Sequence, residues 1–143
     1  MNDLATTVFD DLWRLAQGSV LAQLGQAYKH ALNGNPAGVA GCITTEVISV
    51  AEGDPYHAWN VAECYALIDN ADQALHWLDR AVSRGFVNYP LIAELDPFLA
   101  SVRRDPRFAS LRQSVKGKWE QGEVRKASGS RKRPGSSSKA ANT

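Results

Sequence analysis

The chain lacks a long apolar run, a basic leader and a set of cysteines, and each absence excludes a class of protein. No stretch approaches the roughly 18 consecutive apolar residues that a bilayer-spanning helix needs. The first eleven residues are acidic, which is not the pattern of a secretory signal peptide. Two cysteines, Cys42 and Cys64, are too few for a disulfide framework. We therefore expect a cytoplasmic protein with reduced thiols and no membrane association.

The usual motifs of catalysis and metal binding are absent as well. His30, His57 and His76 are far apart in the sequence. His57 and Cys64 share a helical face, but zinc sites usually need three or four such ligands. Cys64 lies in the middle of an apolar helical segment, not in the open, electropositive surroundings of a nucleophilic cysteine. The sequence therefore predicts no catalytic residue, no metal site, no cofactor and no enzymatic activity.

The most informative feature that is present is the pair Asp-Pro, which occurs at Asp54-Pro55, Asp96-Pro97 and Asp105-Pro106. An Asp carboxylate can accept hydrogen bonds from the free N–H groups of a first helical turn. Proline suits the first helical position, where its missing N–H would have had no partner. Apolar residues at helical spacing follow each pair. Residues 54 to 121 are therefore predicted to form short helices joined by tight turns.

The spacing of apolar residues predicts an all-α fold along the rest of the chain. We expect helices at 3–17, 20–32, 37–51, 55–68, 71–84, 90–95, 97–103 and 106–121. Asn33-Gly34 and Gly85 are expected to end helices in the left-handed conformation. The β-branched residues of 37–51 also suit a strand, but the helical neighbours on both sides favour a helix.

Charge and composition divide the chain into two parts. From Gly122 onward there is no aromatic residue, and Val124 is the only large aliphatic side chain, which predicts disorder. This tail carries six basic side chains against one acidic, a net charge of +5, while the other 121 residues carry ten basic and fourteen acidic. We expect a helical domain over 1–121 and a disordered basic tail over 122–143.

Two helical hairpins share a pattern of large, small and aromatic residues. Leu24-Gly25-x2-Tyr28 recurs about 37 residues later as Val61-Ala62-x2-Tyr65. In the second hairpin the return helix adds Ala74, Leu78 and Ala81 at gaps of four and three. This pattern resembles the tetratricopeptide repeat. The first hairpin departs from it, because its return helix has Ala37, Gly41 and Thr44 at the matching offsets and the period exceeds the usual 34 residues.

A closer likeness covers roughly residues 27 to 121. It rests on the combination of runs at 62–68, 74–82, 85–90, 96–99, 103–108 and 116–120. Together they resemble the C-terminal closing segment of bacterial tetratricopeptide proteins, which is often fused to a kinase, cyclase or DNA-binding regulator domain. The resemblance implies a short stack of antiparallel hairpins with a capping helix. The chain has no Gly-rich loop, His-Arg-Asp or Asp-Phe-Gly run, so kinase activity is not implied.

The resemblance also implies where a partner would bind, because the first helix of each hairpin lines the groove of such repeats. The residues expected there are Gln23, Gln26, Lys29, Tyr56, Trp59, Asn60 and Glu63. Trp59 has two interpretations, as a side chain packed against a neighbouring helix or as part of the groove. The function expected is a non-catalytic adaptor that binds a peptide or protein partner. The apolar N-terminal face is the expected self-association surface, formed by Leu4, Val8, Phe9, Leu12 and Trp13.

The basic tail suggests an alternative function. Five side chains could hold phosphate groups by charge alone, namely Arg125, Lys126, Arg131, Lys132 and Arg133. No aromatic residue lies among them to stack on bases. The alternative is therefore a regulatory protein that binds nucleic acid through its tail and uses the helices for dimerisation. The simpler interpretation, which we favour, is a solubilising tail with no specific partner.

Overall fold

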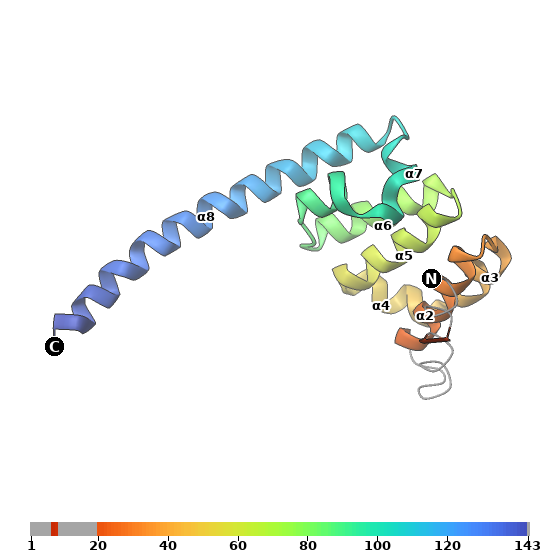
Figure 1. The fold of residues 1–143 in the computed structure, drawn as a ribbon, viewed down its shortest axis with the longest axis horizontal. Coiled ribbons are helices and arrows are strands. Elements are labelled where there is room, and N and C mark those ends of the chain that lie inside the picture. The colour runs from red at the N-terminus through yellow and green to blue at the C-terminus, as the bar shows by residue number, and fades with distance from the viewer. Residues whose placement is uncertain (1–6, 9–19, 143) are drawn as a thin grey trace.

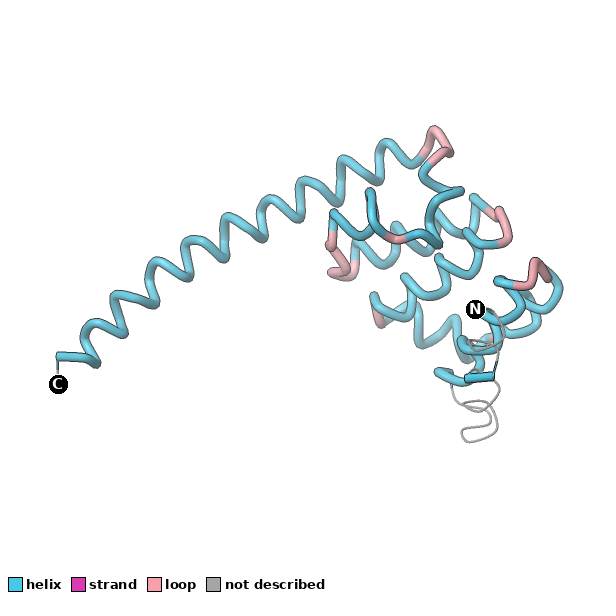
Figure 2. The backbone as a smooth tube through the Cα atoms, in the orientation of Figure 1, coloured by secondary structure: helices cyan, strands magenta, loops and turns pink. Residues whose placement is uncertain are grey.

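The computed structural model describes residues 7–8 and 20–142, with side chains described as far as Lys126. Every element in these ranges is helical, and no strand occurs in them, which confirms the all-α prediction (Figures 1 and 2). The elements are α2 (Val20–Leu32), α3 (Pro36–Cys42), α4 (Thr45–Gly53), α5 (Pro55–Leu67), α6 (Ala71–Ser83), η1 (Leu91–Leu95), η2 (Pro97–Leu99), α7 (Ala100–Arg103) and α8 (Phe108–Asn142).

Helix α5 lies at the centre of the body. It packs against α2 and α4 on one side and against α6, η2 and α7 on the other. The core that results is made largely of aliphatic and small side chains, with Leu24, Val39, Val47, Val61, Leu78, Ile92, Leu99 and Val102 among its buried members. Whether these helices form a tetratricopeptide-like stack stays a prediction.

The segment 37–51 is helical, as expected, but the prediction of a single helix is wrong. The structure divides it into α3 and α4, with a break at Ile43-Thr44. The Thr44 hydroxyl accepts a hydrogen bond from the backbone N–H of Val47 at 3.3 Å, which caps α4. A threonine that caps a helix takes an extended backbone conformation, so the preceding helix ends before it.

Two of the three Asp-Pro pairs begin a helix as predicted. Asp54 accepts from the N–H of Tyr56 at 2.9 Å, and Asp96 accepts from the N–H of Phe98 at 2.9 Å. The third pair, Asp105-Pro106, forms a turn instead. The Asp105 carboxylate accepts from the N–H of Arg107 at 2.9 Å, and α8 begins at Phe108, two residues later than expected.

Two glycines close helices in the left-handed region, as predicted. Gly34 has φ of 68° and Gly85 has φ of 116°. Asp69, in the turn between α5 and α6, also has a positive φ of 60°. The next residue, Asn70, caps α6 through a hydrogen bond from the N–H of Gln73 at 3.2 Å.

Residues 86–103, here called the closing segment, cover the end of the hairpins. Phe86, Ile92 and Leu99 are buried. The side chain of Leu95, by contrast, is 67% exposed. The reason is that η1 is a single turn, so one of its leucines points to the solvent while its neighbours fill the core.

Helix α8 leaves the body and projects away from it (Figure 1). Phe108, Leu111 and Val115 are buried, and Trp119 is half-buried. The helical backbone then continues to Asn142, beyond the expected end near Gln121. The disorder of 122–143 stays a prediction. Within the described ranges no helix is both long enough and apolar enough to span a bilayer.

Candidate interaction site

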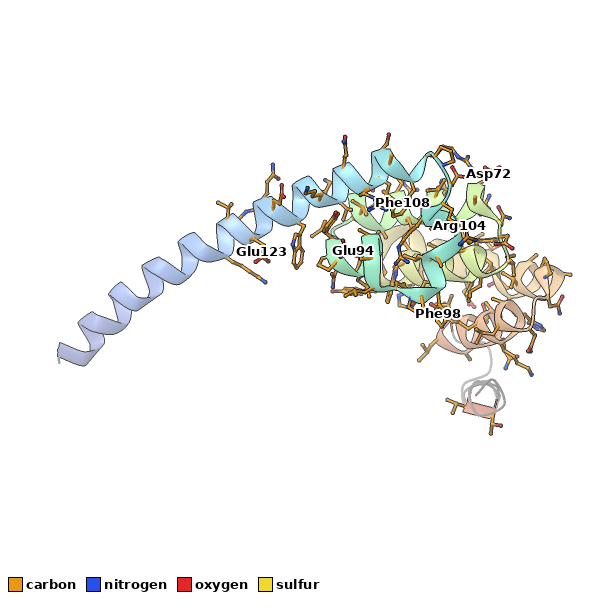
Figure 3. All side chains as sticks on the ribbon, turned by 45° about the horizontal axis from the view of Figure 1, so that its top comes forward. Asp72, Glu94, Phe98, Arg104, Phe108 and Glu123 are labelled. Atoms are coloured by element: carbon orange, nitrogen blue, oxygen red, sulfur yellow. The ribbon has the colours of Figure 1, made fainter. Side chains whose placement is uncertain are left out.

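The phase of α5 decides which side chains gather at the candidate site. Because Asp54 and Pro55 begin the helix, Tyr56, Trp59 and Glu63 follow at spacings of three and four and share one face. This face meets α2 on one side and the closing segment on the other. Figure 3 labels Glu94 and Phe98 on the closing segment.

Trp59 is packed against the closing segment. Its indole Nε1–H donates a hydrogen bond to Oδ2 of Asp96 at 3.1 Å. Its ring stacks on Phe86, with 4.9 Å between the ring centroids and 21° between the planes. The structure therefore agrees with the interpretation of Trp59 as a packed side chain. The side chain is half-buried.

Asn60 and Glu63 face α2 rather than open solvent. The hydroxyl of Tyr28 lies 2.9 Å from Oδ1 of Asn60 and 2.5 Å from Oε1 of Glu63. The carboxyl of Glu63 also hydrogen-bonds the carboxyl of Asp96. Glu63 is 5% exposed and Asp96 is 3% exposed. A partner therefore cannot reach the Glu63 carboxyl in this conformation.

No cation pairs with the two buried carboxyl groups among the residues that the structure describes. Arg103 is nearby, but its guanidinium donates to backbone carbonyls, at 2.9 Å to Ile92 and 2.7 Å to Asp96. Burial, together with the hydrogen bond and charge of Asp96, raises the pKa of Glu63 to about 9. Glu63 is therefore protonated at neutral pH.

The residues predicted on the first hairpin lie along α2. The side-chain carbonyl of Gln23 accepts from Oγ1 of Thr44 at 2.6 Å, and its amide donates to Oε1 of Glu46 at 3.2 Å. Gln26 and Lys29 are half-buried on the same helix. The structure thus joins Gln23 to α4, whereas Tyr28, which the sequence did not single out as a site residue, joins α2 to α5.

The most accessible of the predicted groove residues on α5 is Tyr56. Its side chain is 63% exposed, and its ring meets the edge of the buried Phe86 at 5.4 Å between centroids and 75° between planes. Tyr56, Trp59 and Phe86 therefore form one cluster, here called the aromatic patch. The exposed Leu95 immediately precedes Asp96, which holds Trp59.

The predicted tail patch is described only in part. Arg125 and Lys126 are exposed on the projecting part of α8, which also carries Glu123 (Figure 3). Lys126 lies 3.9 Å from Glu123. The side chains of Arg131, Lys132 and Arg133 lie outside the described set. So does the predicted self-association surface, apart from the exposed Val8.

The described residues contain no group of three or more His, Cys, Asp and Glu side chains that could hold a metal ion. Cys64 is buried, and burial raises the pKa of its thiol well above the usual value. Comparisons of the chain with models of protein families, with curated proteins and with solved structures found no match.

Proposed function

We propose that the chain is a non-catalytic, tetratricopeptide-like module that binds a peptide or protein partner through the exposed face of α5. The observation that carries this proposal is the aromatic patch, in which Tyr56 is 63% exposed and rests against Phe86. Aromatic side chains in such positions are favoured anchors of protein interfaces. Because Phe86 already restricts the Tyr56 ring, binding a partner would cost little further side-chain entropy.

The small residues of the repeat pattern also support this type of module. Gly25 of α2 and Ala62 of α5 are both buried, as the repeat pattern requires of its small residues. Helices α2 and α5 pack together, and the hydroxyl of Tyr28 reaches Asn60 at 2.9 Å. In this proposal Asn60, Glu63 and Trp59 hold the face together, and Tyr56 with Leu95 contacts the partner.

Affinity capture from the organism that encodes the chain tests the proposal. The variant carrying both Tyr56→Ala and Leu95→Ala should lose at least roughly tenfold of the recovered partner, because it removes two exposed anchors. Leu21→Ala is the matched control, since Leu21 is 61% exposed on α2. Quantitative mass spectrometry compares the partner recovered by the wild type, by the double variant and by Leu21→Ala. A partner recovered equally by all of them would contradict the proposal.

A second candidate is binding of nucleic acid by the basic tail. The observation that favours it is that α8 projects from the body with Arg125 and Lys126 exposed (Figure 1). If this is the function, DNA affinity should fall steeply with salt, and a chain ending at Gln121 should lose both the affinity and the salt dependence. Equal binding by the two chains would exclude the tail as the binding element.

A further inference from the structure

Two carboxyl groups from distant parts of the chain meet inside the body. Glu63 belongs to α5, and Asp96 follows η1 in the closing segment. Both are almost fully buried, and their carboxyl groups hydrogen-bond each other. Two ionised carboxylates within hydrogen-bonding contact repel one another, so the pair is stable only when one of them carries a proton. The contact between α5 and the closing segment thus includes a shared proton.

The groups that face Glu63 provide hydrogen bonds rather than a balancing charge. From α2, the Tyr28 hydroxyl lies 2.5 Å from Oε1 of Glu63. From α5 itself, the Asn60 amide contacts the same hydroxyl, and the thiol of Cys64 lies close enough to interact electrostatically with Glu63. Burial raises the pKa values of both the tyrosine and the cysteine, so both are neutral wherever Glu63 titrates.

The groups that face Asp96 are likewise few. Trp59 donates its indole N–H to Oδ2, and the backbone N–H of Phe98 donates to Oδ1. From α7, Arg103 is the charged neighbour, but it donates to the backbone carbonyl of Asp96. Arg103 interacts electrostatically with Asp96 and also with Glu94, although no ion pair joins it to either carboxylate. With its guanidinium held by carbonyls, Arg103 does not replace the proton that Glu63 supplies.

We propose that Glu63 and Asp96 form a proton-dependent clamp, which holds the closing segment on α5 and loosens when the shared proton is lost. Both residues of the clamp lie in this chain, so the clamp does not require the partner proposed above. Three short elements make up the segment that it holds, namely η1 of five residues, η2 of three and α7 of four. Elements this short are not stable without tertiary contacts, so this region opens locally when those contacts weaken.

The direction of the pH effect follows from where Glu63 loses its proton. In the closed state the pKa of Glu63 is raised to about 9, while in the open state the carboxyl is in water and its pKa returns to the ordinary value of 4.5. The stability that the proton gives the closed state is therefore fully present at pH values below the open-state pKa of Glu63. This stability falls as the pH rises toward 9, and the opening equilibrium should increase about tenfold per pH unit in between.

Hydrogen exchange of the full-length chain at pH 6, 7 and 8 tests the clamp. After correction for intrinsic exchange, amides of residues 86–103 should show opening that increases about tenfold per pH unit in the wild type. Glu63→Gln should abolish this dependence, because its amide can donate to Asp96 without titrating. Glu94→Gln is the matched control. It makes the same side-chain change at an exposed position two residues from Asp96 and should keep the wild-type slope.

Three results would overturn the clamp. The first is an equal pH dependence in the wild type and in Glu63→Gln. The second is a loss of protection in α6 that parallels the loss in the closing segment, because this would indicate global unfolding. The third applies even if Glu63→Gln does not fold: a carbon-13 titration of the Glu63 carboxyl in the wild type should have its midpoint well above pH 6, and a midpoint near the ordinary glutamate value excludes the clamp.

Discussion

The two hairpins follow one sequence pattern but differ in their return helices. In the second hairpin, Ala74, Leu78 and Ala81 are all fully buried, and α6 is continuous over 13 residues. In the first hairpin the matching positions are Ala37, Gly41 and Thr44. The first two are exposed, and Thr44 caps a new helix instead of packing.

This difference relates the pattern of small and large residues to whether the return helix is continuous. A large residue between two small ones gives α6 a buried stripe that packs against α5 along its length. In the first hairpin these three positions do not form the buried stripe, and the buried side chains of this segment are Val39, Ile43, Val47 and Ala51 instead. A cap at Thr44 then stabilises the chain more than another helical turn would. Repeat likeness at the first helix of a hairpin thus does not ensure likeness at the second.

The largest expected effect comes from removing the buried side chain of the continuous return helix. Leu78→Ala should lower the free energy of unfolding by about 2–5 kcal/mol, because Leu78 is fully buried and its loss leaves a cavity. Urea denaturation measures the change. Gln73→Ala, an exposed substitution in the same helix, is the control. A loss below about 1 kcal/mol would mean that α6 does not depend on this stripe.

The next effect sharpens the contrast within the first hairpin, where two glycines of α3 differ in their surroundings. A Cβ at Gly38 would lie 2.3 Å from the ring of His30, whereas a Cβ at Gly41 would meet nothing within 4 Å. Gly38→Ala should therefore destabilise the chain by about 1–3 kcal/mol through overpacking. Gly41→Ala should stabilise it by up to about 1 kcal/mol through helix propensity.

Thermal unfolding of the two glycine variants measures these opposite signs. Adding His30→Ala to Gly38→Ala provides the control, because it removes the ring that the new methyl group would strike. The double variant should recover part of the lost stability. If Gly38→Ala and Gly41→Ala had the same effect, close packing of α2 on α3 at His30 would be ruled out.

The smallest expected effect tests the cap that separates α3 from α4. Thr44→Ala should lower the free energy of unfolding by about 1 kcal/mol, because the N–H of Val47 loses its acceptor. Thr44→Ser keeps the hydroxyl and should change little. Asn70→Ala removes the corresponding cap of α6 and should cost a similar amount. Denaturation curves compare the three, and an unchanged Thr44→Ala curve would show that the break has another cause.

Much of the fold was predictable because the signals are local. The Asp54 and Asp96 caps and the left-handed Gly34 and Gly85 each depend on residues within one helical turn. The break at Thr44 was missed because the threonine fits a helix by apolar spacing alone. Its hydroxyl both caps α4 and donates to Gln23, 21 residues away, and that second contact is not visible in local sequence.

For the candidate site, the sequence predicted which residues lie on the helix but not which of them are exposed. The resemblance implied that Tyr56, Trp59, Asn60 and Glu63 line a groove from one predicted helix, and all four do lie on α5. Spacing did not indicate which of them would be covered. Trp59 is held by a residue 37 positions further along the chain, and Glu63 by one 35 positions earlier. Their binding role, the identity of a partner and the cellular location stay predictions.

By itself, the sequence determined the helices, most of their ends and the face that each presents, because these depend on contacts three or four residues apart. The tertiary structure alone decided that Glu63 and Asp96 meet in the interior while Tyr56 stays outside. Burial removes water from a carboxyl group and brings a second one beside it, and both effects require segments that are distant in the sequence to pack together.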